Sequence, residues 1–192
     1  MHKGCIKDKA KENEMQESIG KVPDLQGLAH RSAIMELLSS HSRYLDRLDA
    51  AGLKALYWPE AQVDYGGFKG LAHEFAGFVM GALQQQYELT QHRVSNTLIR
   101  FDANTAFSES YVFAKHLVRD GNSEMVFSGR YLDQFELREQ FWKFRHRHVV
   151  MDWSRRWAVE DERESQSFKA LSKGSQDAND LSWRYLMPDA SG

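Results

Sequence analysis

TQHRVSNTLIRF, residues 90–101, is the first of four long segments in which polar and apolar side chains alternate. A period of two is typical of a strand that turns one face toward a core. Three further segments share this character: residues 105–118, 125–136 and 141–153. The turn signals between the segments, at 102–104, 119–122 and 138–140, are short enough for antiparallel hairpins. This half of the chain is therefore predicted to form a four-stranded antiparallel sheet.

Helical periodicity dominates the sequence before these strands. Apolar residues recur at helical spacing between Leu28 and Leu48, and a further helix is predicted over 71–87. Between them, Asp49 is expected to cap a short helix that Pro59 ends, and residues 61–65 alternate like a strand. Helices segregated from a mostly antiparallel sheet indicate the α+β class. We expect a curved sheet that wraps three N-terminal helices as a cone-shaped α+β barrel with an internal cavity.

Composition favours one compact domain. The chain has 192 residues, of which 42% are hydrophobic and 12% aromatic. We expect a flexible polar leader over 1–24, the folded domain over 25–154 and a C-terminal extension over 155–192. The 25 basic residues nearly balance the 27 acidic residues, so no overall charge attracts nucleic acid or an anionic membrane.

Cys5 is the only cysteine, which excludes an intramolecular disulfide and a thiol-rich zinc site. The sequence shows no apolar stretch of signal-peptide length and no segment able to span a bilayer. A cytoplasmic location is expected from these features.

His92 is the first candidate functional residue. Alternation places it on one face of its strand with Val94, Asn96 and Leu98, while Arg93 lies on the other face. An inward histidine is either a hydrogen-bonded core residue or a general base that abstracts a proton near neutral pH. The pattern alone favours the core interpretation.

His41 interrupts the apolar stripe of the first helix and is a second candidate. It is either hydrogen-bonded within the core or part of a wet pocket, because an unpaired polar group would be costly there. Asp46 and Asp49 are both candidates for a carboxylate partner of His92, and periodicity does not decide between them. No diagnostic ligand spacing supports a metal site.

Aromatic residues at strand and helix positions are candidates for the wall of an apolar cavity, although most aromatics at such spacing are ordinary core. The candidates for contact with a substrate are Tyr65, Phe78, Tyr111, Phe113 and Tyr131. Arg147 is a candidate for stabilising a developing anion, with a surface arginine as the alternative. No phosphate loop, nucleophile elbow or His-Glu-x-x-His motif is present.

Several motifs together carry a resemblance to a known family. They are HRSAI at 30–34 leading to YLDRLD at 44–49, VDY at 63–65, TQHRVSN at 90–96, YLDQFE at 131–136 and WKFRHR at 142–147. Their order and spacing resemble the SnoaL-like family of the nuclear transport factor 2-like superfamily. Within it, the chain is most similar to the branch of hexachlorocyclohexane dehydrochlorinase, bile-acid dehydratase and scytalone dehydratase.

The resemblance implies a catalytic dyad of His92 with Asp46, leaving Asp49 as a helix cap. It implies a lyase, without cofactor or metal, that eliminates water or halide from a hydrophobic cyclic substrate, and a homo-oligomer with a trimer preferred. His41 and Arg147 match pocket positions in relatives. The alternatives are an isomerase or cyclase of a polyketide or steroid-like compound, and a non-catalytic binding or assembly module.

Overall fold

The computed structural model describes residues 20–119 and 121–186. The chain divides into two compact units, residues 1–32 and 33–192. The first unit contains the start of helix α2, where the Asp24 carboxylate accepts a hydrogen bond of 2.7 Å from the Gly27 N–H. Most of the expected polar leader lies outside the described residues. The following paragraphs concern the second unit.

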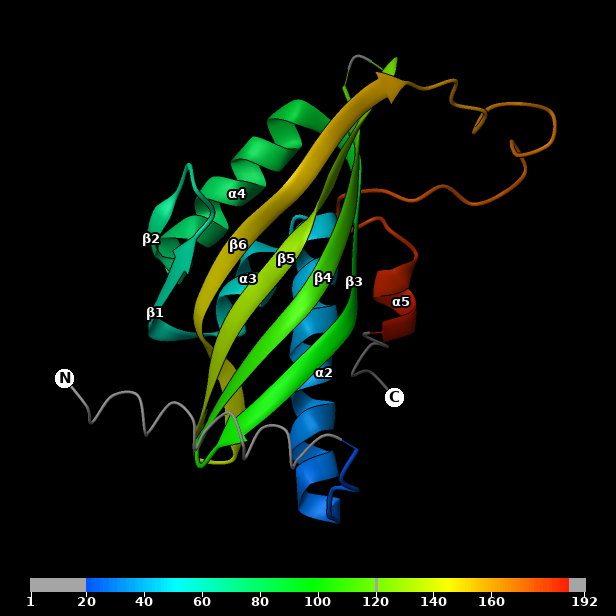
Figure 1. Cartoon of the computed structure of the whole chain (residues 1–192). Helices are drawn as coiled ribbons and strands as arrows, with labels where there is room; N and C mark the ends of the chain where they lie inside the picture. The colour runs from blue at the N-terminus through cyan, green and yellow to red at the C-terminus, as the bar shows by residue number, and fades with distance from the viewer. Residues whose placement is uncertain (1–19, 120, 187–192) are drawn as a thin grey trace. The chain divides into compact units, whose positions relative to one another are not determined.

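Four helices occur in the described ranges, labelled in Figure 1: α2 Leu25–Asp46, α3 Ala50–Ala55, α4 Ala72–Gln86 and α5 Ser182–Leu186. The predicted cap of the short helix is confirmed, because Asp49 Oδ1 accepts a hydrogen bond of 2.8 Å from the Gly52 N–H. Among the described residues, no helix has both the length and the apolar character needed to cross a membrane.

The described strands form one sheet in the order β2-β1-β6-β5-β4-β3. Their bounds are β1 Tyr57–Asp64, β2 Lys69–Leu71, β3 Tyr87–Asp102, β4 Thr105–Val118, β5 Ser123–Arg138 and β6 Phe141–Ala158. Every neighbouring pair is antiparallel except β1 with β6. The α+β class is confirmed, and the sheet is curved and open, because β2 and β3 are its two edges. Short strand β2 was not predicted.

A bulge in β3 changes which side chains point inward. The pairing with β4 shifts between Ser95 and Leu98, and Asn96 has a φ of 47°. The extra residue reverses the alternation. Leu98 is consequently 61% exposed, whereas Ile99 is buried. The prediction that Asn96 and Leu98 share the face of His92 is therefore wrong.

A second bulge, in β6, brings Arg147 into the core. The register with β5 shifts so that Phe135 pairs with Phe144 while Gln134 pairs with His146. Strict alternation would place Trp142 and Arg147 on opposite faces, but the bulge buries both. The alternative of a surface arginine is excluded.

The helices and the sheet enclose the main core. In Figure 1, α3 and the C-terminal part of α2 lie behind the broad sheet, so one face of the central strands is covered and the other faces the viewer. Ile34 and Leu38 of α2, Phe75 of α4, and Phe135 and Phe144 of the sheet are almost completely buried in one cluster. A smaller cluster forms farther along the same face, around Val112, Ala114 and Tyr131.

Candidate functional site

Asp46 and His92 meet at the end of α2. Asp46 Oδ1 lies 2.7 Å from His92 Nδ1 and also accepts a hydrogen bond of 2.9 Å from Thr90 Oγ1. Asp46 Oδ2 accepts a hydrogen bond of 3.0 Å from the backbone N–H of His92. Three donors from one strand therefore fix both oxygens of the carboxylate. Asp49 has no part in this arrangement, since its side chain caps α3.

The carboxylate determines the tautomer of His92. An ionised carboxylate only accepts hydrogen bonds, so Nδ1 of the neutral imidazole carries the proton. Nε2 is then the acceptor atom of the ring. The side chains of His92 and Asp46 are only 8% and 12% exposed, which keeps most water from the pair.

His92 lines an apolar cavity of about 180 Å³. Side chains from two helices, four strands and the turn after β1 form its wall: Leu45, Tyr65, Val79, Leu83, His92, Ala114, His116, Met125, Phe127, Tyr131 and Val149. The few polar groups among them are two imidazoles and two phenols. The cavity therefore suits a compact, mostly apolar molecule that presents one or two polar groups.

His116 is a second imidazole in this cavity. Its ring lies edge-on to that of His92, with 5.4 Å between centroids, and its Nδ1 is 3.3 Å from the Met125 carbonyl oxygen. Burial, with the nearby His92, lowers the pKa of His116 to about 4. At neutral pH the ring is uncharged, Nδ1 donates to the carbonyl, and Nε2 is an acceptor.

His41 lies in the core rather than among the residues of the cavity wall. It is completely buried, and its Nε2 is 2.9 Å from the Tyr57 hydroxyl. The rings of Tyr57, Tyr131 and Phe144 surround it at centroid distances of 5.6 to 6.3 Å. Burial, together with the charges of Arg147 and His92, holds the pKa of His41 well below its usual value. His41 is thus a neutral residue behind the cavity.

Arg147 and Asp133 form a completely buried ion pair. Arg147 Nε and Nη2 each donate a hydrogen bond of 2.7 Å to one oxygen of Asp133. The guanidinium carbon lies 4.0 Å from the ring centroid of Tyr131, a residue of the cavity wall. Burial opposes the charge of Arg147, but Asp133 raises the pKa of the arginine well above its usual value. The pair therefore provides a fixed positive charge behind Tyr131.

Tyr65 connects the ion pair with the cavity. It lines the cavity, stacks on Phe75 at 4.1 Å, and has a buried hydroxyl. Burial raises the pKa of Tyr65, and the Arg147 guanidinium opposes that rise. Its hydroxyl is therefore a neutral donor under the influence of a positive charge.

Three further predicted site residues, all aromatic, do not line the cavity. Phe78 is on the outer side of α4, 56% exposed, beside Phe68. Tyr111 and Phe113 alternate with buried Val112 on β4, so they lie on the face of the sheet opposite His92. Aromatic character alone suggested these residues, whereas the parity of each strand decides which face they occupy.

Sequence reasoning missed four residues that surround the dyad and the ion pair: Tyr57, Thr90, His116 and Asp133. Strand parity offered a signal for three of them. Thr90 is two residues from His92, and Asp133 is two residues from Tyr131. Thr90 pairs directly with His116 across the sheet. Within the described residues, no group of three or more His, Cys, Asp and Glu side chains is placed to hold a metal ion.

Solved structures similar to this one include enzymes. A hexachlorocyclohexane dehydrochlorinase, LinA type 2, has a TM-score of 0.66 and 24% identity, covering 72% of this chain and 95% of its own. LinA type 3 from Novosphingobium barchaimii has a TM-score of 0.66 and 22% identity, with coverages of 72% and 97%. A protein of Novosphingobium aromaticivorans assigned to the scytalone dehydratases has a TM-score of 0.63 and 23% identity, with coverages of 70% and 91%. At these identities the likeness establishes the fold.

The sequence itself places the chain in a family. No match was found among curated proteins. The SnoaL-like domain profile, however, matches residues 26–148, which span α2 to the middle of β6 and include both members of the dyad. The chain therefore belongs to the SnoaL-like family, in the nuclear transport factor 2-like superfamily.

Proposed function

We propose that the protein is a lyase that eliminates water or halide from a small hydrophobic ring compound. The observation that carries this proposal is a histidine whose Nδ1 is held by Asp46 and whose ring lines an apolar cavity. Such an arrangement supports general base catalysis, because the carboxylate stabilises the imidazolium that forms when His92 accepts a proton. Similarity to dehydrochlorinases and to a protein assigned as a dehydratase supports an enzyme of this kind.

In the proposed reaction, His92 Nε2 removes a proton from a ring carbon. The electrons of the broken C–H bond form a C=C bond with the neighbouring carbon, whose bond to the leaving group breaks. Halide leaves as an anion, whereas a hydroxyl group leaves as water by taking the proton that the His92 imidazolium returns from Nε2. Asp46 remains ionised throughout and is paired with the imidazolium. No cofactor is required in this scheme.

Tyr65 and Tyr131 are proposed to assist the leaving group. Both line the cavity, and Arg147 lies behind them as a fixed positive charge. A neutral phenol near a cation is a good donor to a departing oxygen or halide. His116 has the opposite role, because its neutral Nε2 accepts a hydrogen bond from a substrate hydroxyl. His41 and Asp133 orient these groups from behind without contacting the substrate.

The test is mass spectrometry of halogenated and hydroxylated ring compounds, including a hexachlorocyclohexane and scytalone, after incubation with the protein. We expect loss of hydrogen chloride or water with the wild type and no loss with His92→Ala. His148→Ala, which replaces an exposed histidine of β6, is the matched control and should retain activity. Conversion to a product of unchanged mass would favour an isomerase, and binding without conversion would favour a binding module.

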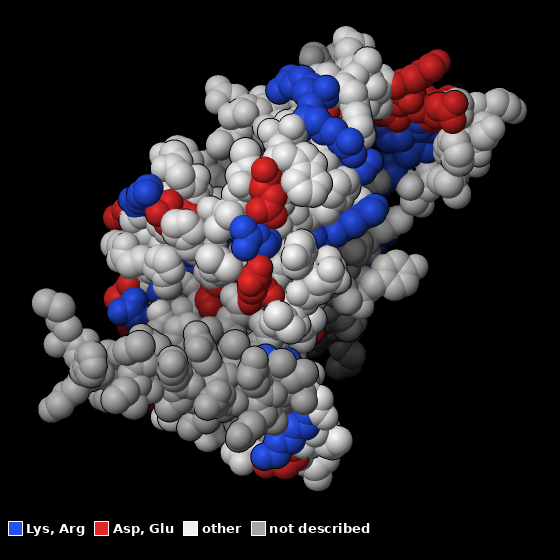
Figure 2. Space-filling model, in the orientation of Figure 1, with Lys and Arg blue, Asp and Glu red and all other residues white. Residues whose placement is uncertain are grey.

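We also propose that copies of this chain associate as a homo-oligomer, with a trimer preferred, through the face of the sheet that the helices leave uncovered. Figure 2 views this face, where uncharged atoms predominate around a short row of charges. Its exposed apolar side chains include Leu98, Phe107, Tyr111 and Trp153. Such an apolar surface marks a protein interface. Light scattering should show a trimer for the wild type and a smaller species for Tyr111→Lys.

A further inference from the structure

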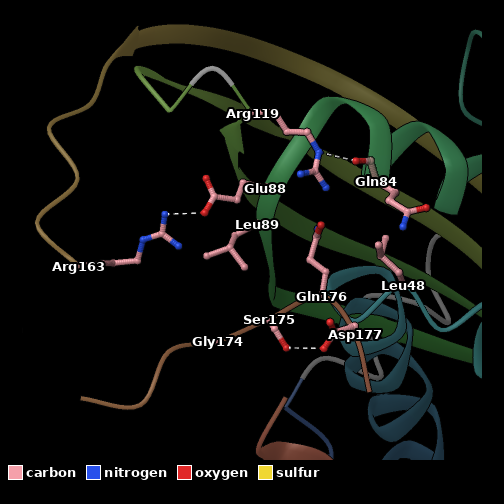
Figure 3. Close-up of a pocket in the computed structure, with 10 residues that line it drawn as sticks. All are labelled: Leu48, Gln84, Glu88, Leu89, Arg119, Arg163, Gly174, Ser175, Gln176 and Asp177. Carbon is pink, nitrogen blue, oxygen red and sulfur yellow. Dashed lines mark hydrogen bonds and ion pairs between the residues drawn. The ribbon is translucent and has the colours of Figure 1, made fainter. Parts of the chain in front are cut away.

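The chain continues beyond the family match and returns to the body of the second unit. After β6, an irregular segment leads to residues 174–183, which we name the clasp. In Figure 1 it lies beside β3 and ends in α5. Figure 3 shows its first residues, Gly174 to Asp177, facing Leu48, Glu88 and Leu89 across a pocket of about 280 Å³. The clasp thus lies where α2 ends and β3 begins.

The clasp holds the end of α2 through arginine side chains. Asp180 is 3.3 Å from Arg47 Nε, and Arg47 Nη1 donates a hydrogen bond of 3.1 Å to the backbone carbonyl of Asp46. One turn earlier, Arg43 donates to Ser182 Oγ at 3.3 Å, and its guanidinium lies over the Trp183 ring. Asp180 is thus separated from the backbone of the proposed catalytic aspartate by one side chain.

Asp180 is built into the clasp as a fixed anion. It is 6% exposed and accepts hydrogen bonds from the backbone N–H groups of Ser175 and Ser182, each at 3.0 Å, and from Ser182 Oγ at 2.5 Å. Burial alone would raise the pKa of Asp180, but these hydrogen bonds and Arg47 outweigh it and lower the pKa to about 2. The carboxylate is therefore ionised at neutral pH.

The clasp also holds the start of β3. Gln176 is buried, and in the amide orientation that satisfies both of its polar atoms it donates to the carbonyls of Tyr87 and Glu88 at 3.3 and 3.1 Å. Thr90 and His92 follow on the same strand. The clasp consequently contacts both α2, which carries Asp46, and β3, which carries His92.

We propose that the clasp positions Asp46 against His92, and that Asp180 is the positioning residue that acts through Arg47. This inference rests on the proposed function only where it predicts an effect on turnover. The contact between Asp46 and His92 is present without substrate. Residues 174–183 lie outside the family match at 26–148, so the match does not include the clasp.

NMR spectroscopy of the His92 Nδ1 proton tests the proposal without substrate. A proton held between imidazole and carboxylate resonates far downfield and exchanges slowly with water. We expect roughly tenfold faster exchange in Asp180→Asn, because an amide nitrogen would face a donor and the charge opposite Arg47 would be lost. Asp177→Asn is the matched control: Asp177 is exposed, and its side chain accepts hydrogen bonds from Ser175 and Asn179 rather than from an arginine of α2, so the exchange rate should not change.

Arg47→Gln tests the same contact from the helix and serves if Asp180→Asn fails to fold, which thermal unfolding would reveal. Unchanged exchange in Arg47→Gln, or equal acceleration in the Asp177→Asn control, would overturn the positioning role. Once a substrate is known, the proposal expects Asp180→Asn to lower kcat with little change in KM and Asp180→Glu to recover part of the loss. Wild-type protein without turnover would contradict the proposed function alone.

Discussion

Two buried acid–base pairs lie on the same side of the sheet, and they differ in their capacity for chemistry. Asp46 binds His92 through Nδ1, and His92 lines the cavity with a second ring nitrogen, Nε2, that is able to accept a proton. Asp133 binds Arg147, which stays protonated and is completely enclosed. The first pair is suited to moving a proton, and the second to holding a charge in place. The comparison shows that the basic partner and its access to the cavity, rather than the carboxylate, decide the role.

The largest effect is expected from Asp46→Asn. The amide cannot balance the charge of the imidazolium, so kcat should fall by roughly 10³-fold, which is about 4 kcal/mol. Asp49→Asn is the matched control, since asparagine caps a helix as well as aspartate does. Kinetics on the substrate from the screen measure both variants. Full activity in Asp46→Asn would remove the distinction between the two pairs.

Asp133→Ala should act on stability first. It leaves the Arg147 guanidinium buried without a counter-ion, which costs about 3 to 5 kcal/mol of unfolding free energy. Urea denaturation measures the loss. Replacing both partners, as Asp133→Leu with Arg147→Met, should recover much of that stability. A cost for the single change as small as that of Glu109→Gln, which breaks an exposed pair with Arg130, would contradict the description of a dry ion pair.

His116→Gln should change how the free energy of unfolding depends on pH. In the folded protein the pKa of His116 is about 4, whereas the ordinary value is 6.5. The unfolded chain therefore binds more protons between these values, and stability falls as the pH drops from 6.5 to 4. Over that window the variant should lose less stability than the wild type, by at most about 3 kcal/mol. Urea denaturation at several pH values measures this, with His148→Gln as the exposed control. Equal pH dependence in wild type and His116→Gln would contradict it.

Most of the fold could be predicted from the sequence because the patterns that indicate helices, strands and turns are local. Alternation and turns located all four long strands, and residues 105–118 match β4 end to end. The cap at Asp49 followed from one helix terminus. Strand β2 was missed because three residues carry too little periodicity to distinguish a strand from a turn.

The site was harder to predict from the sequence. It depends on which face of the sheet each side chain occupies, and on contacts between residues far apart in the chain. One extra residue in β3 reversed Asn96 and Leu98, and one in β6 buried Arg147. No local pattern fixes the position of a bulge. The partner of Arg147 was also hidden, since Asp133 reads as an ordinary polar residue until the register of β5 with β6 places the two side by side. Periodicity likewise did not decide between Asp46 and Asp49, and only the family resemblance favoured Asp46.

Thr90→Val should give the smallest effect. It removes one of three hydrogen bonds to Asp46 and keeps the branched shape, so kcat should fall roughly tenfold or less, with KM unchanged. Thr97→Val is the control, because that hydroxyl lies 3.1 Å from Ser110 Oγ and contacts no carboxylate. Thr90→Ser should restore the rate, since serine returns the donor. Equal losses in both valine variants would indicate a general effect on the strand, and Asp46 would then be held by His92 alone.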